Sequence, residues 1–330
     1  MTECQTFLDA LDGERYLALE VELEPLGAPT IQPTAFANTG PSFYEAPDGG
    51  LAAVVDSVAS MANQLELTIW DEAECRPRDW VAPLPWVKVV DANENYYTSS
   101  RRAAHRLNAA SIMTGTVHPD GEVFGSRLKG LLAAATPPVE RRLAEVVWKH
   151  DPLSIVHGCW FAGIWDGRAR LTRALTARID ALGVQSQSVQ VGGQKTRDAL
   201  DEPGKVQNVG FETVRGETPY YTSEVSAARI VAPIVLDLGL LRSYGLRGEA
   251  YRALVATAVL MIGELVTAWP RRRSRCMLVP KGKPSVRMPH GWTLPPLDEL
   301  REETFRRCKE ATGVERAEPL VVRYTRGSKA

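Results

Sequence analysis

Hydrophobic and polar positions alternate strictly near the start of the chain. Between residues 16 and 24, leucine or valine stands at every odd position from 17 to 23, and the even positions carry alanine and three glutamates. This period of two predicts a strand with one buried face. A loop rich in proline and glycine, residues 25–50, separates it from a helix predicted over residues 51–67. The apolar stripe of that helix consists of Val54, Val58, Met61, Ala62 and Leu65.

The rest of the chain predicts further helices and strands. Helical periodicity is found at residues 99–113, 124–135, 138–149, 248–268 and 297–311, the last of which ends before Gly313. Strand-like runs are found at 154–162, 219–236, 276–279 and 320–324, and a short strand and helix are expected at 169–183. Two stretches predict irregular structure: 76–96, rich in proline and tryptophan, and 184–217, rich in Gln, Gly and Ser. An irregular stretch as long as the second is uncommon inside a domain and is usually functional or mobile.

Without the inserted stretches, the order of elements is strand, helix, strand, strand, helix, strand. This is the order of the ferredoxin-like or RRM fold, so we expect an α+β protein with one such domain over residues 1–330. RRM domains usually stack bases on aromatic residues of their sheet. Here the polar face of the first strand carries Glu20, Glu22 and Glu24, which would repel phosphates. We therefore expect nucleic acid, if bound, to contact helix surfaces or inserted segments.

Charge is distributed unevenly along the chain. Residues 1–75 hold 14 acids and one base, whereas residues 76–330 hold 38 bases and 26 acids, although the net charge is only −1. Such asymmetry points to a polyanion contact on one part. An acidic surface that is solvated, or that faces another subunit, is an equally good explanation for the first part. In a protein that stacks on itself, acidic and basic faces can also meet each other.

Other features exclude several classes of protein. The five cysteines form no CxxC pair, which argues against a zinc site and suits a reduced, cytoplasmic protein. The acidic start of the chain does not resemble a secretory signal. The longest charge-free run in the apolar segment 250–268 is eleven residues, Ala253–Gly263, and a membrane span needs about 20. No hydrolase, P-loop, zincin or dinucleotide motif occurs, and we expect no catalytic residue, metal or cofactor. His157, in an apolar run, is interpreted as a core residue.

Two polar surfaces are candidates for contact with nucleic acid. On the helix of residues 51–67, Ser60, Asn63 and Gln64 can donate hydrogen bonds to phosphate or a 2′-hydroxyl. The predicted helix 99–113 carries a largely basic face, consisting of Arg101, Arg102, His105, Arg106 and Asn108. Gln32, after the first strand, is a further candidate, or else a turn residue before Pro33. Each helix face can equally be an ordinary solvated surface. The densest basic runs, 271–275 and 281–283, carry the same ambiguity.

Several segments in series resemble a known family. They read "IQPTAFANTG" (31–40), "DSVASMANQLE" (56–66), "SSRRAAHRLNAASI" (99–112), "DPLSIVHGCWFAG" (151–163) and "GRARLTRALTARIDA" (167–181). Together they are similar to the CRISPR-associated RAMP protein that forms the backbone of type I-U (also called I-G) Cascade, the Cas-seven-type family. The resemblance runs with gaps from about residue 15 to 280. Related sequences often carry a basic residue where this chain has Gln64.

The resemblance implies both an architecture and a role. It implies an RRM-like palm, an inserted finger region at about 70–150 and a thumb loop at about 184–217, in which Lys195 and Arg197 are the basic pair and Val191 or Leu200 wedges between bases. It implies a non-catalytic subunit that stacks in several copies along one guide RNA (crRNA). Its partners would be that RNA, target DNA paired with it, other copies of itself, other Cascade subunits and a recruited helicase-nuclease. Some RAMP relatives cut RNA with a thumb aspartate, so a metal-dependent ribonuclease using Asp198 or Asp201 is the alternative.

Overall fold

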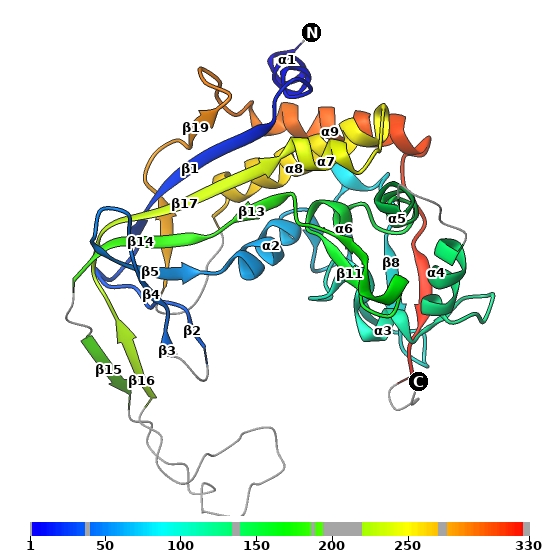
Figure 1. Ribbon diagram of the computed structural model, residues 1–330, viewed down its shortest axis with the longest axis horizontal. Helices are drawn as coiled ribbons and strands as arrows, with labels where there is room; N and C mark the ends of the chain where they lie inside the picture. The colour runs from blue at the N-terminus through cyan, green and yellow to red at the C-terminus, as the bar shows by residue number, and fades with distance from the viewer. Residues whose placement is uncertain are drawn as a thin grey trace, which may run out of the picture.

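The first predicted strand is confirmed as β1 (Tyr16–Pro25), which lies inside the main sheet (Figure 1). Its odd-numbered residues from 17 to 23 are buried and its even-numbered residues face the other side. The computed structural model describes residues 2–36, 40–133, 139–185, 189–193, 220–269 and 276–325. The alternation in the sequence therefore predicted both the element and its buried face.

The main sheet is antiparallel. Besides β1 it contains β4 (Phe43–Glu45), β5 (Leu51–Asp56), β13 (Leu175–Ala177), β14 (Ile179–Val184), β17 (Ala227–Asp237), β18 (Leu278–Pro280) and β19 (Ser285–Met288). The order is β18-β1-β17-β14-β5-β4, with β13 on β17 and β19 on β1, and all these neighbours are antiparallel. The arrangement is an α+β architecture compatible with an RRM-like palm.

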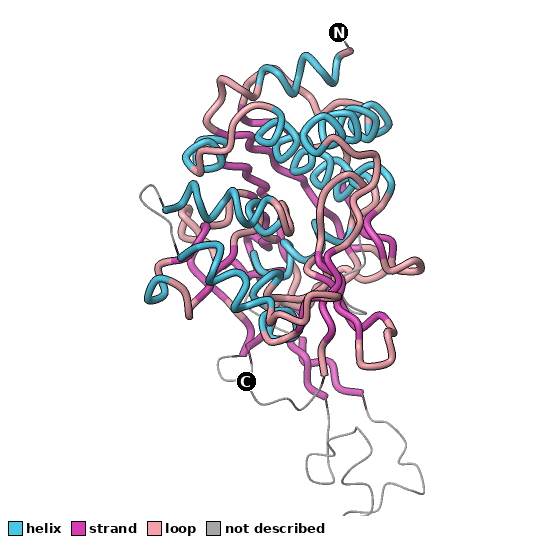
Figure 2. Tube along the Cα trace, turned by 90° about the vertical axis from the view of Figure 1, so that its right-hand side faces the viewer, coloured by secondary structure: helices cyan, strands magenta, loops and turns pink. Residues whose placement is uncertain are grey.

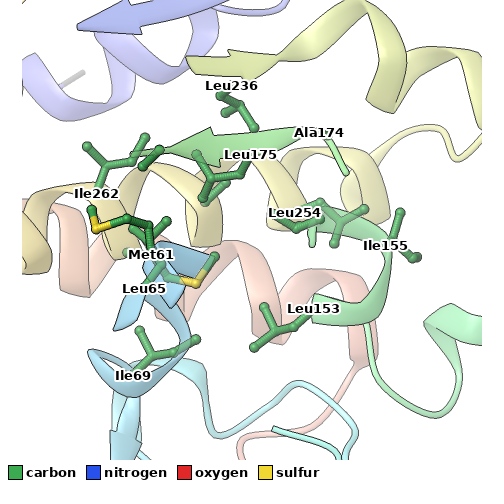
Figure 3. Close-up of a cluster of buried hydrophobic side chains, with 14 of the residues drawn as sticks. Met61, Leu65, Ile69, Leu153, Ile155, Ala174, Leu175, Leu236, Leu254 and Ile262 are labelled. Carbon is green, nitrogen blue, oxygen red and sulfur yellow. The ribbon is translucent and has the colours of Figure 1, made fainter. Parts of the chain in front are cut away.

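Helices cover one face of this sheet. They are α2 (Val58–Leu67), α7 (Leu238–Ser243) and α8 (Glu249–Thr267), with α9 (Leu297–Thr312) packed on α8 and α1 (Glu3–Ala10) on α9. In Figure 3, Met61 and Leu65 of α2 lie close to Leu175 of β13 and Ile262 of α8. By length and composition α8 passes the test for a membrane span, yet 78% of its apolar window is buried inside the protein. It is the core helix expected from the sequence.

A second, smaller sheet lies beside the first. Its strands are β8 (Val87–Val90), β9 (Tyr96–Ser99), β10 (Thr116–Val117) and β20 (Leu320–Arg323). The helices next to it are α3 (Ala110–Met113), α4 (Phe124–Ala133), α5 (Val139–Trp148) and α6 (Leu153–Val156). The order is β10-β20-β8-β9, and β20 is parallel to β8. Residues 70–150 therefore do not complete this sheet alone, because β20, one of its two inner strands, lies outside that range.

One hydrophobic core serves both sheets. Leu153 and Ile155 of α6 lie in the same cluster as Ile69, which follows α2, and Leu254 of α8 (Figure 3). Each of these four residues is at most 1% exposed. The two sheets are therefore packed as a single unit.

Short hairpins complete the described chain. They pair β2 (Ala35–Phe36) with β3 (Gly40–Pro41), β6 (Trp70–Asp71) with β7 (Arg76–Pro77), β11 (Cys159–Phe161) with β12 (Ala169–Leu171), and β15 (Val189–Gly193) with β16 (Tyr220–Glu224). Three 3₁₀ turns are η1 (Asp79–Val81), η2 (Arg106–Asn108) and η3 (Trp165–Gly167). In both Figure 1 and Figure 2 the β15–β16 hairpin extends away from the main sheet. Its first strand lies in the stretch 184–217, which was predicted to be irregular.

Four predicted elements are wrong in type. Residues 51–67 divide into β5 and α2, because the Ser57 side chain accepts a hydrogen bond from the Ser60 backbone N–H and starts the helix there. The strand 154–162 is α6 followed by β11, separated by Gly158 at a φ of +79°. The helix predicted within 169–183 is absent because β13 and β14 pair with β17. Of the helix predicted over residues 99–113, only α3 at its end is helical, because of the arginine contacts described below.

Candidate nucleic-acid interface

The polar face of α2 is present as predicted from the sequence. Asn63 is exposed, and Ser60 and Gln64 are half-buried. Within the described part of the chain, neither amide side chain has a hydrogen-bond partner. Each amide offers two N–H donors and a carbonyl acceptor, so this face can bind a phosphate or a ribose hydroxyl. The opposite face, with Met61 and Leu65, is buried in the core.

A buried ion pair joins α2 to the segment of residues 100–108. The guanidinium of Arg106 donates two hydrogen bonds of 2.7 Å to the two carboxylate oxygens of Glu66. Both side chains are at most 6% exposed. Burial raises the pKa of Glu66 to about 7, although Arg106 acts against this shift. The pair draws the 100–108 segment against the helix.

Arg101 is a second buried arginine in that segment. Its side chain is fully buried and donates to the backbone carbonyls of Leu84 and Pro85 at 3.2 and 3.3 Å. The Asp151 carboxylate lies 3.8 Å from its Nε. Desolvation lowers the pKa of Arg101 and raises that of Asp151. The side chain thus satisfies backbone groups at the start of the second sheet.

These two arginines correct the interpretation of residues 99–113. The segment forms the end of β9, a series of turns, η2 and α3, and Arg106 has a φ of +51°, outside any right-handed helix. Arg101 and Arg106 therefore do not share an exposed helix face. Because their guanidinium groups are buried, they cannot contact phosphate in this structure, and their role is structural.

The remaining candidate residues of the segment, Arg102, His105 and Asn108, are accessible. Arg102 forms a surface ion pair with Glu72 at 3.2 Å, with 38% of its side chain exposed. His105 is exposed and Asn108 is half-buried. His105 precedes Arg106, whose partner Glu66 lies one helical turn from Asn63 on α2. The Arg106–Glu66 pair ties the segment that carries His105 and Asn108 to α2. We call Ser60, Asn63, Gln64, Arg102, His105 and Asn108 the α2 interface.

A groove adjoins this interface at Asn108. Its volume is about 580 Å³. Phe161, Ile164 and Met113 contribute an apolar wall, and Lys129 supplies a positive charge. The remaining lining residues are Thr114, Thr116, Val123, Gly125, Ser126, Gly163, Arg323 and Thr325. An apolar wall with cationic and hydroxyl groups around it suits an aromatic ring attached to an anion.

The other candidates lie elsewhere. Gln32 is half-buried next to Ile31, which forms a β-bridge with Val225. Lys195 and Arg197, together with the alternative catalytic residues Asp198 and Asp201, fall outside the described residues, as do Leu200 and the basic run 271–275. The described residues contain no group of three His, Cys, Asp or Glu side chains that could hold a metal ion.

Two of the three glutamates on the polar face of β1 form ion pairs with cations of neighbouring segments. Glu20 accepts hydrogen bonds from Arg229 at 2.5 Å and from Arg287 at 2.6 Å. Glu22 pairs with Lys281 at 3.3 Å and with Arg229 at 3.7 Å. These cations are already committed to carboxylates, so this face of the sheet has little net positive charge for a phosphate. The ion pairs are partly exposed, and each stabilises the fold only modestly.

Sequence reasoning missed the acidic partners of the buried arginines. Glu66 stands four residues after Ala62, on the apolar stripe of its helix, and a carboxylate in that position needs a buried cation. That signal was available in the sequence. The contact of Arg173 with the core was also not predicted: its Nε–H donates a hydrogen bond of 3.1 Å to the carbonyl oxygen of His157. The interpretation of His157 as a core residue agrees with its exposure of 1%.

Comparisons with known proteins give a family and a structural likeness. The family model described as "CRISPR-associated protein GSU0053" matches residues 17–186. No curated protein matches the chain. A solved structure described as "CRISPR RNA-guided surveillance complex, pre-nicking" contains a chain that aligns with 13% sequence identity and a TM-score of 0.38, covering 90% of this chain and 89% of that one.

Proposed function

Because the chain belongs to the CRISPR-associated protein GSU0053 family, we propose that it is a non-catalytic backbone subunit that binds guide RNA in a type I surveillance complex. The family match carries this proposal, since it agrees with the resemblance read from the sequence. The matched residues run from β1 into the residues after β14 and include α2 and the 100–108 segment. The proposed binding surface thus lies inside the part of the chain that defines the family.

The chemistry of the α2 interface supports binding without sequence preference. A subunit that holds any guide must contact phosphate and sugar and leave the base edges unread. Uncharged amides, a hydroxyl, one histidine and one arginine can all donate to phosphate or to a 2′-hydroxyl. Free donors held in place by a buried ion pair lose little entropy on binding.

The topology supports a ferredoxin-like palm. We interpret β1, β14, β17 and β18 as its four strands, with α2 following the first and α8 following the third. Their order in the sheet, β18-β1-β17-β14, is the 4-1-3-2 order of that fold. On this interpretation β5 and β4 extend the sheet beyond β14, the β15–β16 hairpin is the base of the thumb at 184–217, and the second sheet holds the fingers.

The assembly follows from the same proposal. Several copies would stack along one guide RNA in the cytoplasm and present it for pairing with target DNA. Other Cascade subunits would cap the stack, and a helicase-nuclease would be recruited to cut. We propose no catalytic residue in this chain.

Binding of single-stranded RNA by the purified full chain tests the proposal. We expect affinity that falls steeply as salt rises, because phosphate contacts release counterions. Asn63→Asp places a carboxylate on the α2 interface and should weaken RNA binding about tenfold at 100 mM salt, the order expected for a lost phosphate contact. Asn93→Asp makes the same change in the exposed turn between β8 and β9 and should change the affinity less than twofold. Fluorescence anisotropy with a labelled RNA measures both.

Two outcomes would contradict this. If the wild-type chain bound no RNA, or bound it equally at low and moderate salt, the guide-binding function would be wrong. If RNA bound normally but the two aspartate variants behaved alike, the function would stand and α2 would not be the interface.

A further inference from the structure

The β11–β12 hairpin displays an exposed tryptophan in a fixed position. Trp160 is 53% exposed, whereas its neighbours Cys159 and Phe161 are buried. The indole Nε1–H of Trp160 donates a 2.8 Å hydrogen bond to the carbonyl oxygen of Gly167. The polar edge of the ring is therefore engaged, and its exposed part is largely apolar. A flat aromatic surface of this kind can stack on another ring.

The hairpin is anchored well enough to serve as a platform. The indole N–H of Trp165, at the hairpin tip, donates to the Leu132 carbonyl of α4 at 3.2 Å. Ala169 and Leu171 of β12 are buried. Trp165 and Asp166 both have positive φ, of 50° and 54°, a costly conformation for residues other than glycine. The surrounding contacts hold this turn, so stacking on Trp160 requires little ordering.

Positive charge surrounds the tryptophan. Arg170 is the cross-strand partner of Trp160, so the two side chains leave the same face of the hairpin about 5 Å apart at their Cβ atoms. Arg168 is also exposed. Neither arginine forms an ion pair with any carboxylate in the described part of the chain. Lys129 lies close by, with its Nζ 3.9 Å from the place a Cβ would take on Gly163. Asp166 is the lone acid between residues 159 and 171.

We propose that this hairpin binds single-stranded nucleic acid, with one base stacked on Trp160 and adjoining phosphates at Arg168 and Arg170. The inference rests on the proposed function and adds a second contact to it. An aromatic face beside unpaired cations is the combination that holds single strands without reading their sequence. The groove at Lys129 is lined by Asn108 and by Gly163 and Ile164 of the hairpin loop, so the hairpin and the 100–108 segment border the same groove. The excess of unpaired cations over acids favours a polyanion over a protein partner.

Substitution of the tryptophan tests this with two kinds of strand. Trp160→Ala should weaken the binding of single-stranded RNA by the full chain about tenfold, within the range for one lost stack. It should leave the binding of an abasic ribose-phosphate strand unchanged, and Trp160→Tyr should restore most of the RNA affinity. Arg170→Ala should weaken both strands and lower the salt slope by about one. Tyr97→Ala is the matched control, because Tyr97 is also 53% exposed and lies outside the hairpin. A DNA arm of the same length shows whether guide or target is preferred.

The outcomes separate this inference from the proposed function. Equal losses for Trp160→Ala on base-bearing and abasic strands would overturn stacking. No loss at all, in a chain whose RNA binding still responds to Asn63→Asp, would overturn the hairpin contact and leave the proposed function intact. A change in self-association by sedimentation, with RNA affinity unaltered, would show that a second copy covers Trp160 and would also overturn it. Absence of RNA binding by the wild type would contradict both the hairpin contact and the proposed function.

Discussion

At the scale of single residues, two neighbouring arginines with similar sequence surroundings have opposite environments. Arg106 is bound by Glu66 in the interior, and Arg102 meets Glu72 at the surface. Removing one partner of a buried pair leaves an uncompensated charge. Removing an exposed partner costs little, because water screens the pair. The same residue type thus supports the fold at one position and is available for contact at the other.

We predict that Arg106→Ala lowers the free energy of unfolding by about 3–5 kcal/mol and Arg102→Ala by about 0–1 kcal/mol. Urea denaturation of the two variants measures both values. Among variants that remain folded, Arg102→Ala should weaken RNA binding more than Arg106→Ala does. It should also make RNA affinity less dependent on salt. Equal destabilisation by the two substitutions would contradict the buried role of Arg106.

At the scale of elements, α6 and β11 meet at a glycine whose backbone conformation and close neighbours both disfavour a side chain. Gly158 has a φ of +79°, and a Cβ there would lie 2.8 Å from the Arg173 backbone nitrogen and 2.9 Å from the Leu171 carbonyl oxygen. The junction therefore needs both the left-handed backbone and the empty space. It sets the direction in which the hairpin leaves the core.

Gly158→Ala should destabilise the protein more than Gly121→Ala. Gly121 has a similar φ of +73° but nothing within 4 Å of its absent Cβ, so its variant measures the backbone strain alone. We expect about 1–2 kcal/mol for Gly121→Ala and a further 1–3 kcal/mol for the clash in Gly158→Ala. Thermal unfolding monitored by circular dichroism provides the comparison. Equal destabilisation by Gly121→Ala and Gly158→Ala would mean that the close contacts at Gly158 relax without a cost in free energy.

Element prediction from the sequence succeeded where one period dominated. β1, α8 and α9 were recognised because their apolar residues recur without interruption, and α9 ends at Gly313 in the left-handed conformation. It failed at residues 99–113, where the basic residues suggested a helix face and tertiary pairing with Glu66 and Asp151 determined the backbone. The α2 interface was proposed from the polar face of its helix, and its contact with RNA stays a prediction. The tryptophan of β11 was not proposed, since exposure of an aromatic in a short strand depends on what packs around it.

At the scale of the whole molecule, buried ionisable groups link stability to pH. Burial lowers the pKa of His150, and it lowers the pKa of His157 well below the ordinary value of 6.5. Neither ring nitrogen of His157 has a hydrogen-bond partner in the described structure. Below about pH 6.5 the unfolded chain therefore binds a proton at His157 that the folded chain does not bind. The free energy of unfolding consequently falls as the pH falls. Glu66, whose pKa is raised, has the opposite effect: as the pH falls from about 7 to 4.5, its protonation in the folded chain increases stability.

The contribution of His157 can be isolated by substitution. His157→Leu removes the titrating group from an apolar site and should be as stable as the wild type, or more so, at pH 7.5. As the pH falls from 6.5 to 5, the wild type should lose about 2 kcal/mol relative to the variant, since one pH unit corresponds to about 1.4 kcal/mol. Parallel stability curves for the two proteins between pH 7.5 and 5 would show that His157 becomes protonated without cost.

The position of β20 has a consequence for how the chain is made. Leu320 pairs with Val87, and Val322 with Val89, in parallel register, so an inner strand of the second sheet is synthesised long after β8, the strand that it pairs with. Until then β8 and β10 lack the neighbour that joins them, and their backbone N–H and C=O groups are unpaired. The nascent chain must keep this edge from pairing elsewhere until β20 has been synthesised.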